Sequence, residues 1–289
     1  MGEPRTTPSR AGLAALLERG GALVVSGAGI STGSGIPDYR GPDGRHRDDR
    51  PMTIDRFLES DAEQQAYWAR SHIGWERFRR AAPNAAHRAV TDLQRAGLLC
   101  GVVTQNVDGL HPAAGTTDVI EIHGRLDEVV CLDCDEVTGR DLLAERLDEC
   151  NPGFREQVSA DETAVRPDGD ILLHPRDVAR FTFVGCATCG GRLKPGVVMF
   201  GEQVPRDRYA RARGLVDEAQ ALIVLGSSLS VGSGYRFVLD AARRGIPIAI
   251  VTRGRTRGDA HATIQVDDDL CAVLPAVARE VAGTVLASG

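Results

Sequence analysis

Residues 22–35 read Ala-Leu-Val-Val-Ser-Gly-Ala-Gly-Ile-Ser-Thr-Gly-Ser-Gly, and this stretch decides the fold class. Its first five residues are almost all apolar, which is typical of a strand buried on both faces of a parallel sheet. The glycines after them let the backbone approach a phosphate group closely and offer its amide groups as donors. A phosphate or dinucleotide site therefore explains the stretch better than a flexible connection between a strand and a helix.

The glycine spacing disfavours one class of dinucleotide enzyme. Gly27 and Gly29 fit the G-x-G-x-x-G fingerprint of hydride-transferring dehydrogenases, but Thr32 stands where the third glycine belongs. The acidic residue expected at the end of a second strand is also missing. A zinc-containing dehydrogenase is therefore a weak hypothesis for this chain.

Apolar runs alternate with helical segments along much of the chain. A helix that Ser9 can cap precedes the first run, and Pro83-Asn84 opens another helix. Further strands are predicted at 98–104, 119–122, 221–225, 246–251 and near Ile264, and further helices at about 206–219, 235–244 and from 269 onward. Such alternation predicts an α/β fold with a parallel sheet covered on both faces.

Two stretches interrupt this alternation. Residues 48–82 are charged and helical in pattern, and residues 125–194 hold two cysteine pairs around a polar middle. We interpret both as insertions that together form a smaller module. The large domain would then consist of residues 1–47, 83–124 and 195–289.

The composition excludes several classes of protein. Of the 289 residues, 42% are hydrophobic and 26% are charged, as in an ordinary globular protein. A net charge of −6 disfavours a general nucleic-acid binder, which would be basic. No apolar run reaches the roughly 18 residues of a membrane span, and the N-terminus resembles no secretory signal. We expect a cytoplasmic protein without direct nucleic-acid or membrane binding.

The paired cysteines are the sharpest local signal. Cys131-Leu-Asp-Cys134 and Cys186-Ala-Thr-Cys189 supply four thiolates, which suit a tetrahedral, closed and therefore structural Zn²⁺ site. A redox motif would need one reactive pair after a strand. The odd total of seven cysteines argues against a disulfide scaffold, and Cys100 is expected in the core.

Polar residues follow two of the predicted strands. Gln105, Asn106 and Asp108 come directly after the strand at 98–104, where parallel sheets bind their ligands, although Asn and Asp also favour ordinary turns. His123 ends the strand at 119–122 and is the candidate general base. We interpret the competing His111 as structural, because it lies in a turn-forming segment before a proline.

Two further segments are candidates for ligand contact. Val197–Phe200 could be an extended segment that pairs with a bound peptide by strand addition, with an ordinary hinge strand as the alternative. Residues 226–231 offer more donors at the end of another predicted strand. Lys194, just before the first segment, is the only lysine in the chain, a hint that this position needs Lys and not Arg.

Taken in order, these motifs resemble the sirtuin family of NAD-dependent protein deacylases, over about residues 10–285. The set comprises GAGIS, GIPDYR, TQNVDGLH, HG, two CxxC pairs, KPGVVMFGE and GSSL. RPDGD at 166–170 and YWAR at 67–70 are similar to the class II, sirtuin-four-like branch. The resemblance implies removal of acyl groups from lysine side chains of proteins or peptides, with nicotinamide and O-acyl-ADP-ribose as products.

The resemblance also implies a fold and its ligands. We expect a Rossmann-like large domain, a small domain built from the helical and zinc insertions, an active site between them, and NAD and one structural zinc as cofactors. The glycine-rich segment and the GIPDYR motif would bind NAD through Gly27, Ala28, Gly29, Ile30, Ser31, Thr32, Gly35, Ile36, Pro37, Asp38, Tyr39 and Arg40.

Other motifs would contact the rest of the cofactor and the substrate. Gln105, Asn106, Val107 and Asp108 would hold the nicotinamide-ribose part, with His123 as general base. The adenosine side would meet Gly226, Ser227, Ser228, Thr252, Arg253, Gly254 and Leu270. Thr252 departs from the usual Asn, which could remove one ribose hydrogen bond. The peptide would lie along Val197, Val198, Met199 and Phe200.

Tyr67 and Arg70 form a Tyr-x-x-Arg pattern that grips a carboxylated acyl group in the succinyl-lysine-preferring branch of the family. An Arg fork matches a carboxylate bidentately, so Arg70 could favour such acyl groups. The alternative is that Tyr67 packs in the small module while Arg70 faces solvent.

Two other functions fit the same motifs less well. An NAD-dependent protein mono-ADP-ribosyltransferase would transfer ADP-ribose to a protein side chain without removing an acyl group. A non-catalytic NAD-binding protein is disfavoured, because the QNVD and HG motifs are intact.

Overall fold

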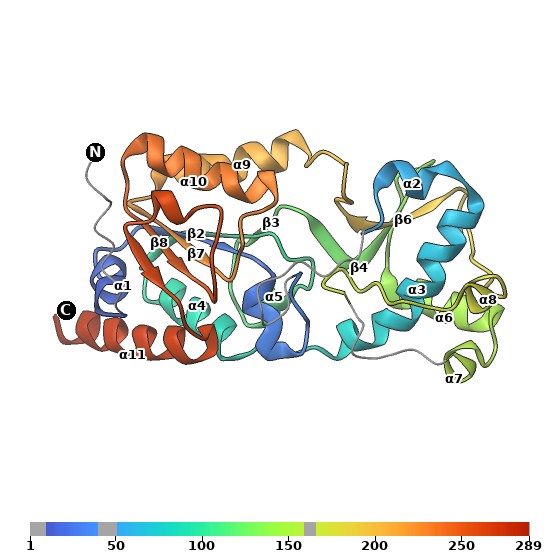
Figure 1. Ribbon diagram of the computed structural model, residues 1–289, viewed down its shortest axis with the longest axis horizontal. Coiled ribbons are helices and arrows are strands. Elements are labelled where there is room, and N and C mark those ends of the chain that lie inside the picture. Colours follow the sequence, from blue (N-terminus) through green and yellow to red (C-terminus); the bar gives the residue numbers. More distant parts are fainter. Residues whose placement is uncertain (1–9, 40–50, 159–165, 289) are drawn as a thin grey trace.

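The protein has two lobes of unequal size (Figure 1). The computed structural model describes residues 10–39, 51–158 and 166–288. The larger lobe is built around a six-stranded sheet, and the smaller one around a three-stranded sheet. No helix in these described ranges is long and apolar enough to cross a membrane.

The larger sheet is parallel throughout and has the order β3-β2-β1-β7-β8-β9. Its strands are β1 (Ala22–Ser26), β2 (Leu99–Thr104), β3 (Ile120–Glu121), β7 (Ala221–Leu225), β8 (Ile248–Val251) and β9 (Ile264–Val266). This is the strand order of dinucleotide-binding α/β sheets, and it reverses between β1 and β7. Ligands of such sheets bind outside the carboxyl ends of the strands at that point.

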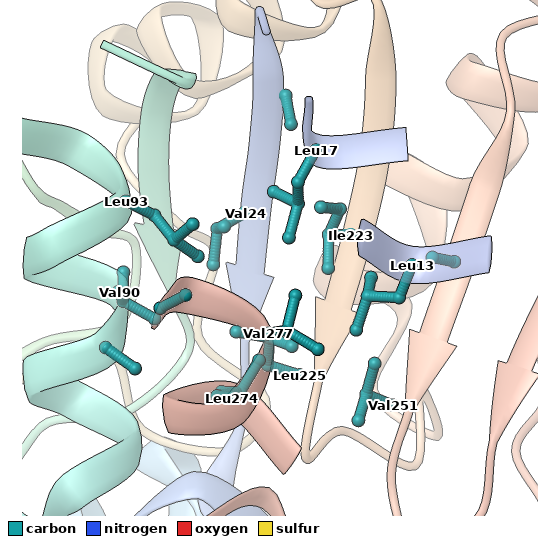
Figure 2. Close-up of a cluster of buried hydrophobic side chains, with 14 of the residues drawn as sticks. Leu13, Leu17, Val24, Val90, Leu93, Ile223, Leu225, Val251, Leu274 and Val277 are labelled. Carbon is teal, nitrogen blue, oxygen red and sulfur yellow. The ribbon is translucent and has the colours of Figure 1, made fainter. Parts of the chain in front are cut away.

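Helices cover both faces of this sheet, so its strands are apolar on both sides (Figure 1). In β1, Ala22 and Val24 face one hydrophobic cluster, while Leu23 and Val25 face the other. Figure 2 shows the first cluster, in which Leu13, Val90 and Val277 approach the strands from three helices. These are α1 (Arg10–Leu17), α4 (Ala85–Arg95) and α11 (Leu270–Ser288), and the opposite face carries α9 (Arg206–Glu218) and α10 (Gly232–Arg244).

The smaller lobe has its own hydrophobic cluster, and most of its residues belong to the two expected insertions. Its antiparallel sheet, in the order β5-β4-β6, lies beside the long helix α3. Arg140 is fully buried there, with its guanidinium 5.4 and 5.5 Å from the ring centres of Trp68 and Trp75. The elements are α2 (Ile54–Glu59), α3 (Asp61–Arg80), β4 (Gly124–Cys131), β5 (Val137–Gly139), α6 (Arg140–Cys150), α7 (Phe154–Gln157), α8 (Pro175–Val178) and β6 (Leu193–Val197).

The α/β fold expected from the alternating pattern is confirmed, and most of the predicted elements begin and end within a few residues of their observed bounds. The antiparallel sheet of the smaller lobe is not among the sequence-based expectations. Its strands are short or irregular: β5 has three residues and a largely exposed pattern, which carries little periodic signal.

Candidate active site

The turns after β1 and β7 meet at the point where the strand order reverses. After β1 the chain forms a 3-10 helix, Ala28–Ser34, and after β7 it turns through Gly226, whose φ is +62°. A Cβ atom at Gly226 would lie 2.4 Å from the amide nitrogen of Ile30, and one at Gly29 would lie 2.8 Å from the carbonyl oxygen of Gly226. Glycine is therefore required at both positions for the two turns to pack together.

A cavity of about 780 Å³ opens beside these two turns. Most of the residues expected to bind NAD through the glycine-rich segment or on the adenosine side line it. They are Gly27, Ala28, Gly29, Thr32, Pro37, Asp38, Tyr39, Gly226, Ser227, Ser228, Thr252, Arg253, Gly254 and Leu270.

Two of the expected NAD contacts that the structure describes line neither cavity. Ile30 is fully buried in the core of the larger lobe, because its side chain packs from the 3-10 helix into the hydrophobic cluster beside β1. Gly35 ends that helix at a φ of +83° and also lines no cavity. Arg40 lies outside the described residues.

A second cavity, of about 690 Å³, lies between the two lobes. Ser31, Ile36, Asn106, Val107 and Asp108 line it from the larger lobe. The segment Val197–Phe200 and the small-lobe residues Met52, Tyr67 and Asp168 line it as well. The first cavity thus lies along the carboxyl edge of the sheet, and the second faces the small lobe.

His123 and Gln105 line both cavities, together with Ala28, Tyr39 and Val231. Nδ1 of His123 is 2.8 Å from the carbonyl oxygen of Gln105, and Nε2 is 2.9 Å from Oγ of Ser233. Because a carbonyl oxygen only accepts, Nδ1 carries the proton and Nε2 accepts from the serine hydroxyl. Burial lowers the pKa of His123, and the positive charge of Arg208 lowers it further. The ring is therefore neutral at pH 7, with a basic nitrogen in the cavity.

A hydrogen-bond network fixes the loop after β2. Nδ2 of Asn106 donates to the carbonyl oxygen of Gly27 at 3.2 Å and to Oγ of Ser31 at 3.0 Å, and that hydroxyl donates to Asp108 at 2.6 Å. Burial raises the pKa of Asp108, although the Ser31 hydroxyl partly offsets this. The network joins the turn after β1 to the loop after β2, so both walls of the cavity are held together.

The segment that leaves the small lobe is tied to the backbone of His123. The amide of Val198 donates to the carbonyl oxygen of His123 at 2.7 Å. Nζ of Lys194 is 3.0 Å from Oε2 of Glu202 and also donates to the carbonyl oxygen of Val197. Oε2 of Glu202 in turn accepts from the amide of Met199 at 2.9 Å. The only lysine of the chain is thus buried and holds this segment in place.

Several backbone groups of the expected peptide-binding segment therefore have partners already. Besides the bonds of Val197, Val198 and Met199, the carbonyl oxygen of Phe200 accepts from the amide of Ile54. Fewer groups are left for strand addition than a free edge strand would offer.

Arg70 does not line either cavity. Its Nε is 2.8 Å from Oδ1 of Asp170, and their side chains are 17% and 3% exposed. Arg166 also pairs with Asp170, at 3.3 Å. A Cβ atom at Gly74 would lie 1.9 Å from the carbonyl oxygen of Gly169, so the turn 166–170 packs directly on α3. Arg70 therefore neither faces solvent nor points into the expected acyl site.

The four expected zinc ligands lie together. Their sulfur atoms are all within 4.8 Å of one another, with Cys131 and Cys189 at 3.5 Å and Cys134 and Cys186 at 3.8 Å. Tetrahedral zinc with Zn–S bonds of about 2.3 Å needs sulfur separations close to these. The cluster therefore fits one zinc ion, and with four thiolates it leaves no position open for chemistry. The cluster belongs to the small lobe, and none of the four cysteines lines either cavity.

His111 lies in the short helix α5 (Leu110–Ala113), away from both cavities. It is buried, and its Nε2 is 2.9 Å from Oγ of Ser26. Its ring packs edge-on against His87, with 5.0 Å between centres. These contacts support the structural interpretation of His111.

Sequence reasoning missed several residues of the second cavity. Ser233 touches His123, and Arg206, Tyr209 and Arg236 line the same cavity from α9 and α10. They belong to ordinary helical segments without a motif, so no local signal could have found them. Asp168 belongs to the RPDGD segment, but nothing in that pattern indicates that its side chain lines the cavity.

Comparisons with known proteins agree on one family. The family model described as Sir2 family matches residues 27–233. "NAD-dependent protein deacetylase 1" of Streptomyces coelicolor is 52% identical, covering 95% of this chain and 91% of the relative. "NAD-dependent protein deacylase SIR4" of Monosiga brevicollis is 47% identical, covering 84% and 79%. A solved structure described as Sir2Tm bound to a propionylated peptide is 29% identical with a TM-score of 0.74, covering 96% of this chain and 99% of that one.

Proposed function

The chain belongs to the Sir2 family, and we infer that it is an NAD-dependent protein deacetylase. One observation carries the chemistry: His123 stands where the two cavities meet. The first cavity follows the carboxyl edge of the sheet, as a dinucleotide requires. The second reaches toward the small lobe and the segment Val197–Phe200, where an acyl-lysine side chain can enter.

The residues present fit NAD. The closely packed glycines of the two turns leave a cavity at the switch point of the sheet, and Gln105 is held in its wall by the hydroxyl of Ser227 at 2.7 Å. When bound, NAD would supply an electrophilic ribose carbon and the hydroxyl oxygens that take up the acyl group. Asn106 and Asp108 lie in the second cavity, on the side of His123, and we propose that they orient the nicotinamide-ribose end.

His123 is the general base of this proposal. Its Nε2 is unprotonated and faces the cavity, so it can accept a proton from a ribose hydroxyl. The Gln105 carbonyl keeps the ring in this tautomer. Lys194 and Glu202 position the segment Val197–Phe200, which would hold the peptide beside the base.

The reaction distinguishes deacylation from ADP-ribosyl transfer by its products. The relatives that match most of this chain are named deacetylases, which favours deacylation. Mass spectrometry of a reaction with NAD and an acetyl-lysine peptide should show free lysine peptide, nicotinamide and O-acetyl-ADP-ribose. A peptide or protein that gains ADP-ribose while the acetyl group stays would contradict the proposal.

We propose that the chain belongs to the class II, sirtuin-four-like branch and prefers uncharged acyl groups. The support for the branch is the packing of the two segments that resemble it, 67–70 and 166–170, on one another. The support for an uncharged acyl group is electrostatic. Arg70 is paired with Asp170, while Asp168 lines the cavity from the small lobe, so a carboxylated acyl group on that side of the cavity would meet the carboxylate of Asp168 and not the guanidinium of Arg70.

Zinc would act only on the stability of the small lobe in this proposal. A site of four thiolates also favours a reducing compartment, because oxidising surroundings would form disulfides. This supports the cytoplasmic location expected from the sequence.

A further inference from the structure

We propose that the arginines along one wall of the second cavity select substrates whose acyl-lysine is flanked by acidic residues. The inference rests on the proposed deacetylase function and names the class of peptide that this site takes. Arg206 and Arg213 of α9 and Arg236 of α10 line the cavity that contains His123. All three are exposed and can therefore reach a bound polypeptide.

Carboxylates of this chain neutralise the positive charge of this wall only in part. Arg213 is paired with Asp240 at 2.7 Å, and that carboxylate is shared with Arg243. Among the described residues, no ion pair forms at Arg206 or Arg236. The cavity has three carboxylates: Asp108 accepts a hydrogen bond from Ser31, Asp168 belongs to the small-lobe segment 166–170, and Glu202 is paired with Lys194.

The arginines of α9 and α10 are placed to contact substrate residues that flank the acyl-lysine. They are not placed to contact the acyl group itself. The segment Val197–Phe200 and the residues 231–233 at the start of α10 both line the cavity. His123 is hydrogen-bonded to both, through Val198 and Ser233. An extended polypeptide that places its lysine at His123 must continue past one of these borders. Because each residue advances an extended chain by about 3.3 Å, side chains a few positions away can reach the α9–α10 wall.

The charge contrast makes this wall selective. The whole chain has a net charge of −6, so it repels acidic polypeptides at a distance. A local excess of arginine charge beside the reacting group reverses that effect only at the site. Arginine is also the residue that binds carboxylates in a bidentate manner.

The test compares kcat/KM for matched acetyl-lysine peptides that differ only in their flanking residues, acidic or alanine, on either side of the lysine. At low ionic strength we expect the acidic peptide to be preferred by about 3- to 10-fold, as befits two exposed charge pairs. The preference should fall toward parity in about 0.5 M salt, because the charges are exposed. The salt dependence of this preference can be measured with the wild-type protein alone.

The charge-reversing double variant Arg206→Glu/Arg236→Glu should invert the preference, so that the acidic peptide becomes the poorer substrate. Arg211→Glu is the matched control, since it makes the same change on α9 at an exposed residue that does not line the cavity, and it should keep the wild-type ratio. Melting curves show whether each variant is folded.

The outcomes separate the two claims. Equal kcat/KM for acidic and alanine peptides in the wild type would overturn the inference and leave the deacetylase function standing. A preference that survives the double reversal, or that Arg211→Glu removes equally, would also overturn it. No NAD-dependent turnover of any acetyl-lysine peptide would overturn the proposed function and the inference together.

Discussion

Ser233 is the residue whose contact with the general base was least foreseeable, because it lies 110 positions from His123 in the chain. Its hydroxyl donates to Nε2, and this hydrogen bond favours the neutral ring, as the burial of His123 does. A ribose hydroxyl that gives its proton to the same nitrogen must replace this hydrogen bond.

We therefore expect Ser233→Ala to raise the pKa of His123, since it removes a donor to the neutral form. One hydrogen bond of about 1 kcal/mol corresponds to roughly 0.7 pH unit. The acid limb of the kcat/KM profile should move up by about that amount. Ser233→Thr, which keeps the hydroxyl, should restore the wild-type profile, and an unmoved limb in Ser233→Ala would contradict this role.

Arg70 makes a contact that its sequence pattern could not indicate. Its partner Asp170 is 100 positions away, in a segment that only the fold brings onto α3. We expect Arg70→Met to lower the free energy of unfolding by about 2 kcal/mol, because a largely buried carboxylate loses one of its two arginine partners.

The ratio of activity on acetyl-lysine and glutaryl-lysine peptides should change little in Arg70→Met. Arg79→Met is the matched control, since it alters a half-exposed arginine of the same helix and should leave stability nearly unchanged. A loss confined to glutaryl-lysine would show instead that Arg70 contacts the acyl group.

At the scale of elements, the zinc cluster joins the loop after β4 to the one before β6. Cys131 ends β4, and Cys186 and Cys189 precede β6, so the metal closes the three-stranded sheet at one end. Neither cavity touches it, so zinc should affect stability before chemistry.

Metal analysis should find one zinc per chain, and Cys131→Ser should lose it. Because zinc binding free energy acts as folding free energy, on the order of 10 kcal/mol in small zinc domains, the variant should melt far below the wild type. Cys150→Ser changes an exposed cysteine of the same lobe outside the cluster and should melt like the wild type. Metal-free wild-type protein with an unchanged melting curve would contradict the structural role.

Periodic elements were predictable and the short ones were not. β1 and β7 lie at the residues that the sequence predicts, because a strand buried on both faces is a continuous apolar run. β4 and β5 carry mixed patterns, since their sheet has one exposed side and irregular register. Gly27, Gly29 and Gly226 of the motifs line the cavity, but the motifs could not separate from them Gly35, which lines no cavity, or Ile30, which packs inward.

Besides His123, the described part of the molecule contains three fully buried histidines whose neutral form is favoured. Burial is the largest cause in each case, and it lowers the pKa of His72 and His111 to about 4 and that of His87 to about 3. His72 lies in α3 of the small lobe, His87 in α4 and His111 in α5.

This arrangement predicts acid lability. The unfolded chain binds protons at these histidines below about pH 6.5, while the folded one does so only near pH 4, so the stability is present above pH 6.5 and lost as the pH falls between these values. In that window, each histidine should lower the free energy of unfolding by about 1.4 kcal/mol for every unit that the pH falls. Burial raises the pKa of Glu121 to about 7 and that of Asp168 to about 6, and these carboxyls offset part of the loss because the folded chain binds their protons first. Melting temperatures should therefore fall between about pH 6.5 and 5, but by less than the histidines alone would give.

The exposed His174 provides a control, because His174→Ala should leave this slope unchanged. A melting temperature that is flat across the same range in the wild type would contradict the assignment of neutral buried histidines.

The architecture of the whole molecule explains why the residues of the site could be only partly identified from the sequence. Motifs at the ends of β1, β2 and β7 meet because parallel strands share one carboxyl edge, and that rule is visible in a sequence. The rest of the second cavity is lined by α9, α10 and the small lobe. Its shape depends on how the two lobes pack, and no local sequence pattern encodes that packing.

The most direct test of the proposed chemistry is the effect of His123→Ala on NAD-dependent deacetylation, measured as kcat/KM for an acetyl-lysine peptide at neutral pH. Loss of a general base typically costs about 10²- to 10⁴-fold, and we expect a loss in that range while the melting curve stays close to that of the wild type. A matched His174→Ala variant should retain full activity. Activity of His123→Ala within about twofold of the wild type would contradict the claim that the reaction takes place where the two cavities meet.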